Sequence, residues 1–252
     1  MRILVANDDG IKAQGLRTLV RAFADAGHAV SVVAPDRQRS ATSHSVSVGK
    51  PIAVRAAEVP GARRAWEIGG MPADCVKLAL RSLARDTEFV LSGINHGYNM
   101  GTDVLYSGTV GAAMEGALGG CPAMAVSLGR NSEDFERAAQ IALKVFAMLL
   151  DTPLPRRHIA NLNVPETVEI RGLRAVPLCP IWYDDRYDIS HDADGNRAYT
   201  LSGDISRSVP DGEDDYHLLL RGYATLTVLS YDLGNHEETD RRAEACGAFR
   251  LA

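Results

Sequence analysis

Two adjacent aspartates, Asp8 and Asp9, follow a short apolar run near the beginning of the chain. Carboxylates placed side by side raise the pKa of one of them unless a cation neutralises their charge. A metal ion is the simplest such cation, and Gly10 lets the chain bend so that both carboxylates can approach it. Because Asn-Asp-Asp-Gly is also a good turn former, this motif alone leaves a metal site and a plain turn open.

A second polar segment, residues 35–45, supplies two arginines and a run of hydroxyl groups that includes Ser40. Such groups suit a phosphate or a metal, although serine and threonine are also common in loops because they form turns. His44 in this segment is either a general acid near neutral pH or a hydrogen-bonded structural histidine. The segment therefore gains meaning only if another loop joins it.

The third polar segment, residues 92–109, is rich in glycine and includes Asn95. It lacks the Gly-Lys-Ser/Thr ending of a P-loop and the Gly-x-Gly-x-x-Gly spacing of dinucleotide binders. Ser107-Gly-Thr109 precedes an alanine-rich predicted helix and offers an anion hydroxyl and N–H groups, assisted by the helix dipole. Thr109 is equally suited to be a simple N-cap.

The three segments together offer carboxylates, a hydroxyl group and an amide carbonyl. These are all oxygen ligands, which favour Mg²⁺ or Mn²⁺ over zinc. The sequence pattern shows no cysteine and histidine cluster that would argue for another metal. We therefore expect one divalent metal ion, Mg²⁺ or Mn²⁺, as the cofactor.

Alternating strands and helices are predicted to position these segments. Residues 3–6 form a short apolar run, apolar residues then recur at three- and four-residue steps before Gly27, and a second apolar run follows at 29–34. This pattern predicts a strand, a helix and a parallel strand. The alternation continues with predicted helices at 75–83, 109–118 and 135–150, and predicted strands at 89–91, 123–127, 159–164 and 173–176.

This order of elements is typical of an α/β fold with a doubly wound, mostly parallel sheet. Ligands bind such sheets outside the carboxyl ends of the strands, so we expect the segments 7–15, 35–45 and 92–109 to converge there. After Pro155 the pattern changes, and the acidic stretch 182–217 predicts a hairpin that turns at Asp194-Gly195 with its acids in water.

Composition restricts the class of partner. The 252 residues carry a net charge of -5, which gives no general attraction to a nucleic acid duplex. The four cysteines are too few for a disulfide scaffold, so we expect them to be reduced. The first apolar run is shorter than that of a signal peptide, and no stretch approaches the roughly 18 apolar residues of a membrane span. We expect a cytoplasmic protein without a membrane partner.

Several collinear motifs resemble the SurE family, the survival-protein-E nucleotidases. The resemblance is carried by residues 2–10, 34–40, 72–75 and 92–116, with a weaker extension at 161–165. It implies one Rossmann-like domain over 1–252, with a core at about 1–165 and an oligomerising, hairpin-containing extension at about 166–252. It also implies a metal-dependent phosphatase, a hydrolase of nucleoside 5′- and 3′-monophosphates that in some members also shortens polyphosphate. A homodimer or homotetramer is the expected assembly.

The resemblance also implies roles for particular residues. The implied metal ligands are Asp8, Asp9, Ser40 and Asn95. The residues implied to face the phosphate of the substrate are Asn99, Ser107, Gly108 and Thr109. We expect Asp8 and Asp9 to be the catalytic residues, one of them holding the metal while the other also accepts a proton from the attacking water; which one does which stays open. Direct attack by an aspartate, which gives a phospho-enzyme, stays open.

Two other functions stay open. A regulatory module can use the same glycine-rich loop and metal to bind a nucleotide without cleaving it, and the fold alone does not separate the two functions. A metal-dependent glycosyltransferase also uses paired acids, and it would release free sugar from a sugar nucleotide. The adjacent aspartates favour hydrolysis, because simple nucleotide binding rarely needs such a concentrated negative site.

Overall fold

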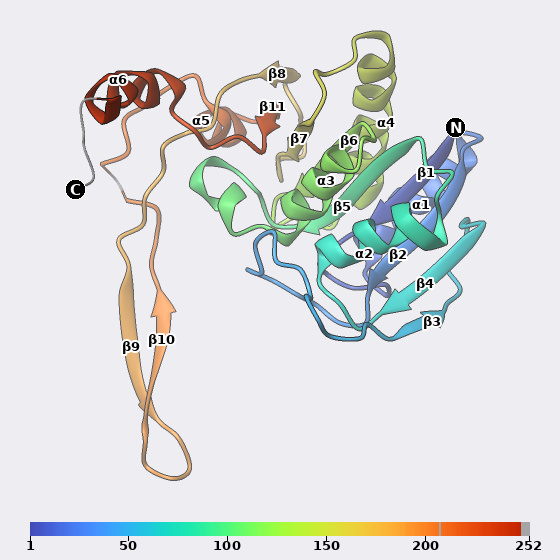
Figure 1. Ribbon diagram of the computed structural model, residues 1–252, viewed down its shortest axis with the longest axis horizontal. Helices are drawn as coiled ribbons and strands as arrows, with labels where there is room; N and C mark the ends of the chain where they lie inside the picture. Colours follow the sequence, from blue (N-terminus) through green and yellow to red (C-terminus); the bar gives the residue numbers. More distant parts are fainter. Residues whose placement is uncertain (207, 248–252) are drawn as a thin grey trace.

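The structure, a computed structural model, describes residues 1–206 and 208–247 (Figure 1). Within these residues nine strands form one sheet. In sheet order they are β3 (Val54–Ala56), β4 (Arg64–Ile68), β2 (Ala29–Pro35), β1 (Arg2–Ala6), β5 (Phe89–His96), β6 (Ala123–Leu128), β7 (His158–Val164), β11 (Ala224–Ser230) and β8 (Leu173–Ala175). The six central strands of this order, β4, β2, β1, β5, β6 and β7, are parallel to one another. Strand β3 is antiparallel to its neighbour β4, and β11 is antiparallel to its neighbour β7.

Helices cover both faces of this sheet (Figure 1). The helices and short helical turns are α1 (Gln14–Asp25), α2 (Pro72–Leu78), η1 (Ala79–Leu83), η2 (Gly101–Leu105), α3 (Gly108–Leu118), α4 (Phe135–Asp151), α5 (Asp215–Leu220) and α6 (His236–Gly247). Side chains of β1 alternate between the two cores, because successive residues of a strand point to opposite faces. Ile3 and Val5 pack with α1 and α4, whereas Leu4 and Ala6 pack with α2 and α3.

The predicted fold class is confirmed by this arrangement. The predicted boundary at residue 92 is wrong: the segment expected to be a loop from there onward begins as strand, because β5 continues to His96. The helix expected at 75–83 begins at Pro72 as α2 and ends as η1. Ser92 pairs with Ala125 of β6, and after an irregularity in the register Asn95 pairs with Ser127. The backbone of this segment still pairs with β6, so the strand continues although several of its side chains are polar.

The predicted hairpin is confirmed in the acidic stretch. Strands β9 (Arg186–His191) and β10 (Arg197–Ser202) form an antiparallel pair that projects away from the main body (Figure 1). We call residues 182–206 the arm. The carboxylate of Asp192 accepts hydrogen bonds from the backbone N–H groups of Asp194 and Asn196, which closes the turn. Among the residues that the structure describes, no helix is both long and apolar enough to cross a membrane.

Candidate active site at the carboxyl ends of the strands

The three polar segments converge at the carboxyl ends of β1, β2 and β5, as predicted. The backbone N–H of Arg39, after β2, donates to the carbonyl of Asp8 at 2.7 Å. The hydroxyl group of Ser43 donates to the carbonyl of Leu105 at 2.6 Å, which joins the second segment to the third. The first and third segments meet where Thr109 contacts Asp8.

A tight turn presents the two aspartates. The side chain of Asn7 donates to the carbonyl of Gly10 at 3.0 Å and accepts from the N–H of Gly10 at 3.2 Å. Gly10 has φ of 96°, a conformation that glycine adopts without the penalty a side chain would bring. The Asn-Asp-Asp-Gly segment therefore forms a turn, and this turn carries both carboxylates.

Asp8 is enclosed by protein. Its side chain is buried, and its Oδ1 accepts a hydrogen bond of 2.5 Å from the hydroxyl group of Thr109. Burial raises the pKa of Asp8 to about 6 against the effect of that hydrogen bond, and the charge of Asp9 adds to the rise. A neighbouring cation would remove this cost of ionisation.

Asp9 is more accessible. Its Oδ1 accepts from the side-chain amide of Gln38 at 3.1 Å, and its Oδ2 accepts from the backbone N–H of His96 at 3.4 Å. Burial also raises the pKa of Asp9, against these hydrogen bonds. Asp9 lines a cavity of about 510 Å³ together with Gln38, His96 and Arg130. A small molecule can therefore reach Asp9 from this side.

The start of α3 lies directly against Asp8. Ser107 is the N-cap, since its hydroxyl oxygen accepts from the N–H of Val110 at 3.1 Å. A Cβ on Gly108 would lie 2.9 Å from the Cβ of Asp8, so only glycine lets the helix approach this closely. The positive end of the helix dipole therefore lies beside the buried carboxylate.

The two predicted asparagines also have polar contacts within the protein. The amide nitrogen of Asn95 donates to the carbonyl of Gly97 at 2.8 Å, whereas the oxygen of that amide is a further acceptor. The amide nitrogen of Asn99 donates to the hydroxyl oxygen of Ser127 at 2.8 Å. The carbonyl of Asn99 accepts from two more asparagines, Asn161 and Asn163.

The remaining residues singled out from the second segment are Ser40 and His44. Ser40 is exposed and follows Arg39, whose N–H anchors the segment to Asp8. The ring nitrogen Nε2 of His44 lies 3.1 Å from the carboxylate of Glu115, which also accepts a hydrogen bond of 2.6 Å from Lys77. His44 is thus a hydrogen-bonded histidine, one of the two alternatives that the sequence left open.

Reasoning from the sequence missed the residues that fasten the third segment. Asn163 accepts from the N–H of Asn99 at 2.9 Å, and the buried carboxylate of Asp215 accepts from the N–H of Gly101 at 2.8 Å. The Asn-Leu-Asn alternation of residues 161–163 was a usable signal, because both asparagines lie on one face of β7. Asp215 comes from α5, far along the chain, and carried no comparable signal.

A second cavity, of about 320 Å³, lies at the other end of the sheet. It is lined by the first residues of β5, β6 and β7, namely Phe89, Ala123 and His158, together with the ends of α3 and α4. It encloses no predicted site residue. Because ligands of such sheets bind at the carboxyl ends of the strands, the cavity beside Asp9 is the better candidate for the substrate.

Comparison with known proteins shows which proteins this chain resembles. A sequence profile described as "Survival protein SurE" matches residues 3–185. A protein named 5′-nucleotidase SurE from a Synechococcus species is 43% identical over 92% of this chain and 93% of its own length. One of that name from Clostridium botulinum is 41% identical over 96% of this chain and 98% of its own length. The crystal structure of SurE protein from Aquifex aeolicus matches with a TM-score of 0.82 and 32% identity, covering 97% of this chain and all of that one.

Proposed function

This chain belongs to the SurE family, and on that basis we propose that it hydrolyses nucleoside 5′-monophosphates at the Asp8 and Asp9 site with the help of a divalent metal ion. The activity of a 5′-nucleotidase, a phosphoric monoester hydrolase, follows from relatives of that name that align with nearly the whole chain. The observation that carries the location of the site is the contact of buried Asp8 with the first turn of α3. The proposal extends to nucleoside 3′-monophosphates and short polyphosphate, which present the same terminal phosphate.

The donor set fits a hard divalent cation. Two carboxylates, the hydroxyl group of Ser40 and the free amide oxygen of Asn95 are all oxygen ligands, as Mg²⁺ and Mn²⁺ prefer. The raised pKa of Asp8 supports this assignment, because a buried carboxylate beside a second one is stabilised by a cation. We propose Mg²⁺ or Mn²⁺ as the cofactor, held by these four residues.

When bound, the cation would supply positive charge for the phosphoryl oxygens and would acidify a water molecule. Asp9 lines the cavity, so we assign to its carboxylate the acceptance of the proton from the attacking water. Asp8 is enclosed by Thr109 and Gly108, so its carboxylate is fixed in position. Direct attack by Asp9 on phosphorus is the variant of this mechanism that would leave a phospho-enzyme.

The first turn of α3 is proposed to bind the phosphate. Ser107, Gly108 and Thr109 would offer N–H groups and the positive end of the helix dipole to the phosphate oxygens. Asn99 is proposed to position this segment. Its side-chain nitrogen donates a hydrogen bond to β6, and its backbone carbonyl accepts hydrogen bonds from β7. Its amide oxygen remains as a group that can accept a hydrogen bond from the substrate.

A homodimer or homotetramer built through the arm is also part of the proposal. Tyr187 pairs with Leu201 and Ile189 with Tyr199, so these four side chains share one face of the hairpin. All four are more than half exposed, and an isolated two-stranded hairpin is marginally stable in water. Contact with another subunit would bury this face. Light scattering that finds only monomers at micromolar concentration would remove this part of the proposal.

We also propose that the enzyme is located in the cytoplasm.

Phosphate release from a panel of nucleoside 5′- and 3′-monophosphates tests the proposed function. We expect release with Mg²⁺ or Mn²⁺ and loss of release after chelation of the metal. Metal-dependent nucleotide binding without phosphate release under any of these conditions would instead support a regulatory binding module. Release of free sugar from a sugar nucleotide would support a glycosyltransferase.

A further inference from the structure

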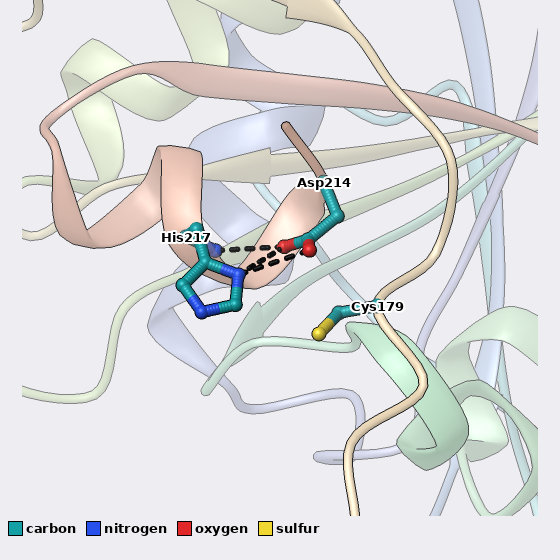
Figure 2. Close-up of side chains that lie close together, drawn as sticks. All are labelled: Cys179, Asp214 and His217. Carbon is teal, nitrogen blue, oxygen red and sulfur yellow. Dashed lines mark hydrogen bonds and ion pairs between the residues drawn. The ribbon is translucent and has the colours of Figure 1, made fainter. Parts of the chain in front are cut away.

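A second group of side chains that can bind a metal lies at the root of the arm, by which we mean the two chain segments that lead into and out of residues 182–206. It is separate from the residues proposed for catalysis. It consists of Cys179, Asp214 and His217 (Figure 2). One ligand atom from each side chain, namely the sulfur, a carboxylate oxygen and a ring nitrogen, lies within 4.8 Å of the other two. Cys179 and Asp214 are buried, and the side chain of His217 is 12% exposed. In the part of the chain that the structure describes, this is the one such group found.

The three residues come from two segments that flank the arm. Cys179 lies between β8 and β9, directly before the arm, whereas Asp214 and His217 lie at the beginning of α5, after it. Asp214 is the N-cap of α5 and accepts from the backbone N–H of His217 at 2.9 Å. Helix capping therefore explains the position of the carboxylate, whereas the buried thiol that lies beside it is not part of the cap.

Sulfur, imidazole and carboxylate together are the donor set of zinc rather than of magnesium. The nitrogen Nδ1 of His217 lies 2.8 Å from one carboxylate oxygen of Asp214 and 2.9 Å from the other. A cation bound by Nδ1, the carboxylate and the sulfur would take the place of the proton between Nδ1 and the carboxylate, and the neutral ring would then carry its proton on Nε2. The other ring nitrogen, Nε2, lies 3.8 Å from the carboxylate of Asp211, which is beyond hydrogen-bond distance.

The charges of the three ligands suit a divalent cation, because a metal ion binds the thiolate form of cysteine and the neutral form of histidine. A thiolate, a carboxylate and a neutral imidazole give a net charge of minus two, which a divalent cation balances.

We propose that Cys179, Asp214 and His217 bind a zinc ion that clamps the two ends of the arm segment together. The proposed zinc site is also connected to the third polar segment, residues 92–109, through a neighbouring residue. Asp215, next to Asp214, accepts from the N–H groups of Cys179 and Gly101 at 2.8 Å each. The zinc would thus fix the root of the arm and, through Asp215, the beginning of η2. Its fourth position is open to a water molecule.

Cobalt(II) in place of zinc tests this site separately from the catalytic one. A thiolate bound to cobalt absorbs in the near ultraviolet, and the four proposed catalytic ligands include no sulfur. We expect this absorption when metal-free full-length protein receives one equivalent of Co²⁺ in excess Mg²⁺, and we expect Zn²⁺ to abolish it. Cys179→Ser should lose the absorption, whereas Cys121→Ser, which removes a partly buried thiol elsewhere in the chain, should keep it.

A second variant separates metal binding from folding. Asp214→Asn keeps a side chain that caps α5 well, but it removes the negative charge, so affinity for Co²⁺ should fall at least about tenfold. Circular dichroism would verify that each variant is folded, and Mg²⁺-dependent phosphate release should persist in Cys179→Ser. Absence of the absorption in the unmodified chain, or the same absorption in Cys179→Ser, would overturn the proposal.

Discussion

The hydroxyl group of Thr109 donates a hydrogen bond of 2.5 Å to Oδ1 of Asp8. This contact joins the first turn of α3 to the end of β1, although 101 positions separate the two residues in the chain. Both side chains are buried. The bond orients one of the two carboxylates proposed to hold the metal, as second partners of metal ligands commonly do.

Thr109→Val removes this hydrogen bond with almost no change in volume. Asp8 then loses its oriented partner while it stays buried, so we expect phosphate release to fall about 10- to 100-fold at saturating metal. Thr109→Ser should restore most of the activity. The matched control is Thr87→Val, which removes a threonine hydroxyl bonded to the carbonyl of Ala84. Equal activity of Thr109→Val and the control would refute the role of this bond.

Gly108→Ala tests the close approach of α3 to Asp8. The new Cβ would lie 2.9 Å from the Cβ of Asp8 and 3.0 Å from Cγ of Pro72, so one of the elements must shift. We expect a loss of about 1 to 3 kcal/mol in the free energy of unfolding and a larger relative loss of phosphate release. Denaturant unfolding and initial rates measure the two effects.

Gly69→Ala is the control for this substitution, because its Cβ would meet only ordinary contacts at 3.8 Å or more. That variant should keep both stability and activity within a small margin. Unchanged activity of Gly108→Ala would show that the helix does not need to lie this close to Asp8.

Asp8 makes the stability of the metal-free protein depend on pH. Its pKa of about 6 in the folded chain lies above its ordinary value of 3.8, so the folded state holds the proton more tightly than the unfolded state. The free energy of unfolding should therefore decrease as pH rises through this window. Asp8→Asn should stabilise the chelator-treated protein at pH 7.5, by roughly 1 to 3 kcal/mol, and have little effect below about pH 4.

Thermal or denaturant unfolding at several pH values, with a chelator present, measures this difference. Asn can still accept the hydrogen bond from Thr109, so the substitution changes mainly the charge. If Asp8→Asn lowers stability at pH 7.5, burial does not make the carboxylate costly in the way that we infer.

The fold was predictable because its signals are local. The apolar runs before Asp8 and around Val32 and the helical spacing of Leu16 and Phe23 each identify an element within a few residues. Parallel strands then bring their carboxyl ends to one edge, which predicts the convergence of the three polar segments. The extension of β5 to His96 was missed because its last residues are mostly polar, although they still pair with β6.

The parts that could not be predicted depend on contacts between distant positions. Asp215 reaches Gly101 only because α5 packs against the third segment. Cys179 and His217 lie on either side of the arm, so the sequence showed no cysteine and histidine cluster. Reasoning from the residues alone therefore identified the oxygen ligands near the beginning of the chain and overlooked the sulfur-containing group near its end.

Asp9→Asn offers the most direct test of the central claim, that the paired aspartates perform metal-dependent hydrolysis of nucleoside monophosphates. Inorganic phosphate released from a nucleoside 5′-monophosphate with saturating Mg²⁺ or Mn²⁺ should fall by at least about 100-fold. The exposed-residue control Asp25→Asn should match the unmodified chain, and both variants should unfold at similar temperatures. A folded Asp9→Asn variant that keeps most of its metal-dependent phosphate release would contradict the account.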